Sequence, residues 1–166
     1  MLGNSVAAAS VGDTRTIGMT RGLSNRARAR ARSVAVQALY QWQLAGQDAL
    51  DIVREFCSER DIEGVDQDYF SELTRGVVAE AADLKALLSP ALGRSYEALD
   101  PVERAVLLLG AFELRHHLEV PARVVINEAV ELTKVFGGAE SHRFINGALD
   151  RLAHEIRGLE FASPSG

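Results

Sequence analysis

The chain has 166 residues, of which 47% are apolar and 25% are charged, values typical of one globular domain or of two small domains that fold as a unit. This composition excludes a disordered chain, and no stretch approaches the roughly twenty apolar residues that span a bilayer, so we expect a soluble protein without a membrane partner. The net charge of -5 is unevenly divided, because residues 1–47 carry six arginines against one aspartate, or +5, which leaves -10 for residues 48–166.

Residues 1–24 are rich in Gly, Ala, Ser and Thr without a sustained period, which predicts a flexible N-terminal tail. With arginines and few acidic residues, this tail also resembles an organelle transit peptide. A secretory signal is excluded, because the apolar patch of the tail is too short. A first helix is predicted to begin at Ser24 and Asn25, which are good cap residues, and to end at Gly46.

Two further helices follow in the first half of the chain. The second is predicted from about Asp48 to Arg60, and Gly64 marks the turn after it. The third runs from about Asp66 to Leu88, where apolar residues recur at steps of three and four, and Pro90 is predicted to end it. The single cysteine, Cys57, falls in the second helix and is expected to be a buried, unreactive thiol, which suits a cytoplasmic protein.

The second half begins after a loop around residues 89–99. Asp100 is predicted to cap a fourth helix, with Pro101 in the first turn and Glu103 reaching back to the Asp100 amide. Pro121 opens a fifth helix, which ends at two glycines, and Ser141 is predicted to cap a sixth.

No segment shows the period-two alternation of a strand, so we expect an all-α fold. The six helices predict a helical bundle of two packed three-helix subdomains, about 25–88 and 100–157. Residues 25–157 then form the folded domain, and residues 158–166 form a C-terminal tail.

Nothing in the sequence indicates an enzyme or a metal site. His116 and His117 are adjacent, so on a helix they point about 100 degrees apart and do not share one ion. His154 lacks the second histidine of a zinc-protease helix, and the glycines at 137–138 lack the Lys-Ser/Thr ending of a phosphate loop. We therefore predict no catalytic residues, no metal and no cofactor.

Four arginines alternate with other residues at the start of the first helix: Arg26, Arg28, Arg30 and Arg32. Like charges so placed repel one another, and the positive end of a helix favours acidic residues, so stability alone does not explain them. A polyphosphate laid across them relieves the repulsion and releases counterions, which drives association with single-stranded nucleic acid. The pattern favours an RNA-binding helix, and the alternative is a solvated basic segment that keeps the helix end soluble.

Polar and aromatic residues continue this helix. Aromatic residues at helical spacing are usually core residues, which is our interpretation of Trp42, whereas Tyr40 fits either the core or stacking on a base.

Four blocks of sequence resemble the bacterial transcription antitermination factor NusB family, in order and over residues 26–157. They are Arg-x-Arg-x-x-Ala-Val-Gln-Ala-Leu-Tyr-x-Trp at 30–42, Val-Glu-Arg-Ala-Val-Leu at 102–107, Val-Ile-Asn-Glu-Ala-Val-Glu-Leu-Thr-Lys-Val-Phe-Gly at 125–137 and Ser-His-Arg-Phe-Ile-Asn-Gly-Ala-Leu-Asp at 141–150. The N-terminal tail departs from the family pattern, in which the arginine helix lies close to the chain start.

The resemblance implies a protein that binds the single-stranded boxA element of ribosomal RNA transcripts together with the ribosomal protein NusE. In this family the complex helps RNA polymerase to read through terminators. By position, the resemblance assigns Arg28, Arg30 and Arg32 to the RNA-binding start, which Arg26 extends. It further assigns Gln37 and Tyr40 to RNA bases, Glu140 and Arg143 to the border of the same RNA, and Glu103 to the protein partner, beside its capping role.

Two other interpretations remain open. Similar helical domains precede RNA cytosine methyltransferases, although this chain leaves no room for a catalytic domain. A protein-only scaffold would use the acidic body alone. A homodimer that covers the arginines in the absence of RNA is also compatible with the sequence.

Overall fold

The computed structural model describes residues 14–60 and 62–162 of the chain. Within these ranges all regular structure is helical and no strand is present, which confirms the predicted all-α class. The helices in chain order are α1 (Thr14–Ala45), α2 (Ala49–Glu59), α3 (Gln67–Leu92), the short 3-10 helix η1 (Tyr96–Ala98), α4 (Pro101–His116), α5 (Ala122–Phe136), α6 (Ser141–Ile156) and the 3-10 helix η2 (Gly158–Phe161). Among them, none combines the length and the hydropathy that a bilayer-spanning segment requires.

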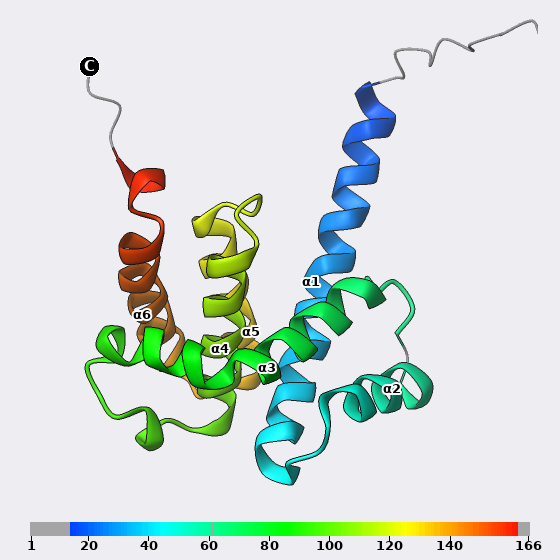
Figure 1. The fold of residues 1–166 in the computed structure, drawn as a ribbon. Helices are drawn as coiled ribbons and strands as arrows, with labels where there is room; N and C mark the ends of the chain where they lie inside the picture. Colours follow the sequence, from blue (N-terminus) through cyan, green and yellow to red (C-terminus); the bar gives the residue numbers. More distant parts are fainter. Residues whose placement is uncertain (1–13, 61, 163–166) are drawn as a thin grey trace, which may run out of the picture.

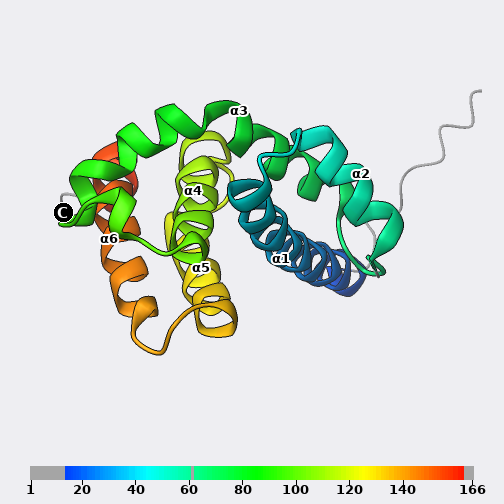
Figure 2. The same ribbon diagram turned by 90° about the horizontal axis from the view of Figure 1, so that it is seen from below.

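The first three helices pack on one another, and so do the last three. Helix α3 joins the two groups, because it contacts α1 and α2 on one side and α4 and α6 on the other. Figure 2 shows α3 running along one side of the molecule across α4 and α1, while α4 sits in the middle between α1 and α6. A single apolar cluster runs through both groups, with buried side chains such as Leu39, Leu73, Leu107 and Leu149.

Helix α1 begins at Thr14, ten residues before the predicted start at Ser24. Ser24 is exposed in the helix interior, where a residue that favours caps does not by itself interrupt the backbone hydrogen bonds. Residues 14–24, placed in the tail by sequence, are therefore helical, and residues 1–13 lie outside the described residues. Figure 1 shows the early turns of α1 projecting beyond the rest of the fold.

Other boundaries differ for local reasons. Helix α3 continues through Pro90 to Leu92 and ends at Gly93, whose φ of 66° is left-handed. Pro90 lacks the amide that would donate to the Ala86 carbonyl, so the helix loses one hydrogen bond there but continues for two residues, and the left-handed glycine sets the stop. Ser141 is the first residue of α6 and not its cap, since Glu140 holds the cap position without a side-chain hydrogen bond.

The start of α4 agrees with the sequence. The Asp100 carboxylate accepts a hydrogen bond from the Glu103 amide at 2.8 Å, and the Glu103 carboxylate accepts one from the Asp100 amide at 3.2 Å. This capping box fixes where α4 enters the core. From Ala105 to Leu114 every residue of α4 is buried, and Glu113 is the one acidic residue in that run.

Candidate nucleic-acid interface

The four arginines of α1 divide into two pairs on different sides of the helix. Each two-residue step turns a helix by about 200 degrees, so alternate arginines face nearly opposite directions. Arg26 and Arg30 are exposed, Arg28 is half-buried and Arg32 is buried with 4% of its surface exposed. The predicted basic start is therefore an outer pair, Arg26 and Arg30, and an inner pair, Arg28 and Arg32.

The outer pair borders a shallow hollow between α1 and the turn that leads to α3. Arg26 and Arg30 line this hollow, of about 360 Å³, together with Gly64 and Val65. The Arg30 guanidinium lies against Gly64, where an added Cβ would stand 1.9 Å from its Nη1 atom. Two exposed guanidinium groups one turn apart offer the paired donors that suit successive phosphates of a nucleic acid.

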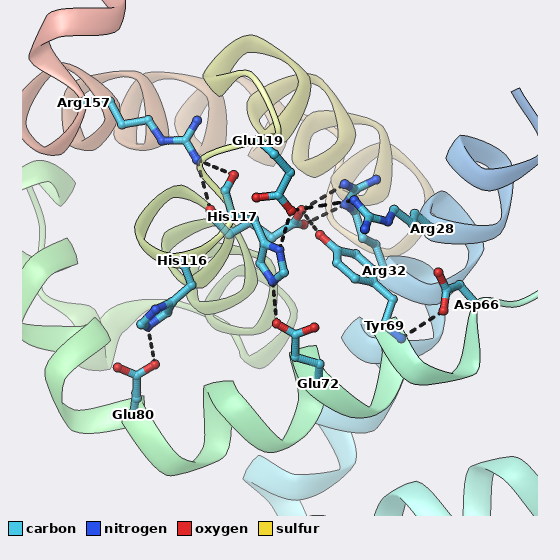
Figure 3. A network of polar contacts seen from close by, with 11 residues as sticks. Arg28, Arg32, Asp66, Tyr69, Glu72, Glu80, His116, His117, Glu119 and Arg157 are labelled. Atoms are coloured by element: carbon cyan, nitrogen blue, oxygen red, sulfur yellow. Dashed lines mark hydrogen bonds and ion pairs between the residues drawn. The ribbon is translucent and has the colours of Figure 1, made fainter. Parts of the chain in front are cut away.

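The inner pair belongs to a buried cluster that joins α1, α3 and α4 (Figure 3). Arg32 donates from Nε to one oxygen of Glu113 at 2.7 Å and from Nη2 to the other at 2.9 Å. Tyr69 donates its hydroxyl to the same carboxylate at 2.6 Å, and Arg28 lies over the Tyr69 ring with its Cζ 4.5 Å from the centroid. Arg32 thus interacts with the protein's own carboxylate, so its assignment to RNA stays a prediction that requires this ion pair to open.

The electrostatics of the cluster favour the closed arrangement. Burial opposes the charged form of Arg32, yet the hydrogen bond and the charge of Glu113 outweigh it and raise the pKa of the guanidinium. Burial, followed by the charge of Glu113, also raises the pKa of Tyr69 well above its ordinary value. The cluster therefore consists of a charged pair and a neutral phenol that donates to it.

A second set of contacts continues from Arg28. Its Nη1 lies 3.9 Å from Glu119, which also approaches Nδ1 of His117 at 2.9 Å. His117 is nearly buried, and its Nε2 lies 2.8 Å from Glu72 on α3. The hydrogen bond from His117 is the largest of the effects that lower the pKa of Glu119. Arg28, one-third exposed, thus has a carboxylate at its side that a phosphate would have to displace.

Gln37 and Tyr40 lie together in a groove of about 570 Å³ farther along α1. The other walls include Leu44 of α1, Val102 at the start of α4 and Phe136 at the end of α5. Tyr40 is 41% exposed and Leu44 62% exposed, which favours a contact role for Tyr40 over a core role. Trp42, by contrast, packs against the core as expected. Cys57 also packs against the core, but it is only partly buried, so the predicted full burial of this thiol is wrong.

The remaining predicted residues lie at helix starts. Glu140 and Arg143 are both largely exposed, 3.7 Å apart, at the beginning of α6, a few residues beyond Phe136 in the groove wall. Glu103 is 8% exposed and its carboxylate accepts from the Asp100 amide, so little of its surface can reach a partner while the cap is intact. No grouping of potential metal ligands occurs among the described residues.

Sequence reasoning missed Glu113 and Tyr69. The available signal was Glu113 itself, a lone acid inside an apolar run of α4, because a buried carboxylate requires a cationic or hydrogen-bonding partner. Nothing local to Tyr69 distinguishes it from an ordinary core aromatic residue.

Fold and site together define a small all-helical protein whose first helix carries an exposed pair of arginines. The chain belongs to the NusB family, whose model matches residues 29–154. It is 53% identical over 131 residues to the transcription antitermination protein NusB of Yersinia enterocolitica, a match that covers 79% of this chain and 95% of the relative.

Two solved structures of NusB chains have the same fold. The chain resembles NusB of T. maritima with a TM-score of 0.72 and 31% identity, over 81% of this chain and 96% of that one. It also resembles a chain in a crystal structure of the antitermination factors NusB and NusE in complex with dsRNA, with a TM-score of 0.64 and 26% identity, over 78% of this chain and 98% of that one.

Proposed function

We propose that this protein is a transcription antitermination factor that binds the boxA element of ribosomal RNA transcripts together with NusE and promotes read-through by RNA polymerase. The observation that carries the proposal is the exposed pair Arg26 and Arg30 on the face of α1 that the fold leaves open. The similar NusB chain that was solved with NusE and RNA supports the choice of partners. On this proposal the protein is cytoplasmic and catalyses no reaction.

The groove around Gln37 and Tyr40 offers a reason for joint binding of RNA and protein. Gln37 and Tyr40 would contact bases, as the sequence predicts, while Val102 would face the protein partner across the same groove. Glu103 lies next to Val102 and would act on the partner mainly through its charge, since it is 8% exposed. The exposed Leu44 suits an apolar contact with a protein, and the acidic residues 48–166 suit a basic ribosomal protein. Because one groove then serves both ligands, each would raise the effective concentration of the other.

RNA titration over a range of salt concentrations tests the proposal. Replacing Arg26 and Arg30 together by Ala should weaken binding and reduce the magnitude of the salt slope by about 1.4, or about 0.7 for each phosphate that the variant no longer neutralises. The matched control is the double Ala variant of Arg54 and Arg75, which are also exposed but lie on α2 and α3. Equal losses of affinity in both variants would contradict a specific arginine face and leave only a general charge effect.

The form of the RNA is tested in the same titration. The similar complex contains double-stranded RNA, whereas we propose a single strand. A single-stranded boxA sequence, its scrambled version and its duplex separate these ligands. Failure of all three to bind would favour the protein-only scaffold.

Glu103→Gln tests the partner surface. Glutamine retains the reach of a capping box, so helix α4 should remain as stable, while the charge that would attract NusE is lost. Calorimetric titration of the variant with NusE should show weaker binding, and unchanged affinity would remove Glu103 from the interface.

Sedimentation of the wild type without RNA tests whether it forms a homodimer.

A further inference from the structure

The buried cluster at Arg32 lies directly behind the exposed arginines, and its geometry points to a role in RNA binding. We propose that Glu113 and Tyr69 are positioning residues: they hold the inner arginines of α1 and thereby fix the direction in which Arg26 and Arg30 face the RNA. This inference rests on the proposed RNA-binding function and adds two residues that touch no RNA.

The first step is the direction that the ion pair imposes. Both donors of the Arg32 fork meet both oxygens of Glu113, so the guanidinium and carboxylate planes are held in one orientation. Glu113 is 1% exposed on the central helix α4, which gives α1 a rigid reference. Apolar residues of similar volume often replace a buried ion pair without loss of stability. They would not hold α1 in one fixed orientation, which is what the ion pair adds.

The second step is the place of the cluster along α1. Arg32 lies two residues from Arg30, and Arg28 lies between Arg26 and Arg30, with its guanidinium over the Tyr69 ring. A backbone hydrogen bond from the Asp66 amide to the Ala27 carbonyl, 3.1 Å long, holds the same turn against the start of α3. Beyond this turn α1 projects from the fold (Figure 1), so the arginine turns are held by these contacts together with the packing of Ala31 in the core.

The alternative is that RNA opens the ion pair and that Arg32 itself binds a phosphate. The two roles predict opposite signs for Glu113→Gln, which leaves Arg32 in place and removes the charge that holds it. Release of Arg32 should tighten RNA binding if Arg32 touches the RNA directly. A loss of orientation should weaken it.

The experiment is a salt-dependent titration of the full chain with single-stranded boxA RNA, under conditions where circular dichroism shows each variant folded. We expect Glu113→Gln to weaken binding about tenfold and to lower the slope magnitude by about 0.7, because one arginine of the outer pair no longer reaches its phosphate. Tyr69→Phe removes one hydrogen bond to Glu113 and should weaken binding about threefold.

Two controls separate positioning from charge and from stability. Glu97→Gln makes the same change of charge at an exposed residue of η1 and should leave the affinity and slope unchanged or slightly strengthen binding. Thr133→Val removes a buried hydrogen bond within α5, to the Ala129 carbonyl, and should lower stability without changing the salt slope.

The outcomes separate failure of the positioning role from failure of the proposed function. Unchanged or tighter binding by Glu113→Gln overturns the inference while the proposed function stands, whereas a wild type that ignores RNA overturns the function itself. If Glu113→Gln does not fold, Tyr69→Phe decides alone, and wild-type affinity in that variant overturns the positioning role.

Discussion

Gly76 lies where α3 meets α4, and the ring of Phe112 occupies the space that a side chain would need. An added Cβ would stand 2.3 Å from Cζ of Phe112, whose ring is almost fully buried. Gly76→Ala forces the ring to shift within a packed core, so we expect it to lower the free energy of unfolding by about 1–3 kcal/mol. Urea unfolding followed by circular dichroism measures this change.

The same substitution at Gly22 is the matched control. No atom lies within 4 Å of a Cβ added there, in the projecting part of α1. Alanine favours a helix over glycine by up to about 1 kcal/mol, so Gly22→Ala should leave stability unchanged or raise it. A Gly76→Ala variant as stable as the wild type would show that Phe112 moves without strain.

Single residues also show where sequence reasoning ends. The alternation of four arginines was enough to predict a basic start to the first helix. It could not predict which pair is buried, because the partner of Arg32 is Glu113, 81 positions away in the chain. Long-range pairs of this kind follow from packing and leave only a weak trace in local sequence.

At the level of elements, helix α5 takes its N-terminal cap from η2, so residues 158–161 are ordered against the fold and not part of the C-terminal tail that the sequence predicted. The Ala122 amide donates to the Glu160 carboxylate at 2.7 Å, and Pro121 at the cap position supplies no side-chain hydrogen bond. This amide, followed by Arg157, lowers the pKa of Glu160 below its ordinary value of 4.5. The carboxylate therefore stabilises the fold only while it is ionised.

The sign of the pH dependence follows from this lowered pKa. A carboxylate whose pKa is lower in the folded protein stabilises the fold at pH values above its unfolded pKa of 4.5. This stabilisation is lost as the pH falls toward the pKa of the folded state. Glu160→Gln should thus be less stable than the wild type at neutral pH, and the difference should shrink below pH 4.5. Urea unfolding at a series of pH values checks this, and a constant difference would contradict it.

A helix boundary was predictable where several local residues indicated the same start. Asp100, Pro101 and Glu103 fixed the start of α4 because each contributes a local contact that tertiary structure need not supply. The boundaries predicted at Ser24 and Pro90 were wrong, because a serine or a proline can also lie inside a helix. Whether the helix ends there depends on the neighbouring turns. The capping of α5 by Glu160 had no local signal at all.

At the scale of the whole molecule, one apolar cluster joins the two groups of three helices. The division into two subdomains suggests separate unfolding, but a shared core predicts one cooperative transition. Trp42 is the single tryptophan and lies on α1, so its fluorescence reports the first group, while circular dichroism reports all helices. We expect the two denaturation curves to coincide, and separate midpoints would show two independently stable subdomains.

Arg157 has a consequence for the order in which the chain can fold. Its guanidinium donates to the carbonyls of Glu113, Leu114, His117 and Val120, which form the end of α4 and the turn beyond it. During synthesis those carbonyls leave the ribosome before the arginine that donates to them. The carbonyls of Glu113 and His117 also accept from the His117 and Val120 amides, so the carbonyls of Leu114 and Val120 depend most on Arg157. We therefore expect the end of α4 to be fixed late, so nascent chains stalled before Arg157 should remain sensitive to protease, whereas the released chain of 166 residues should resist it.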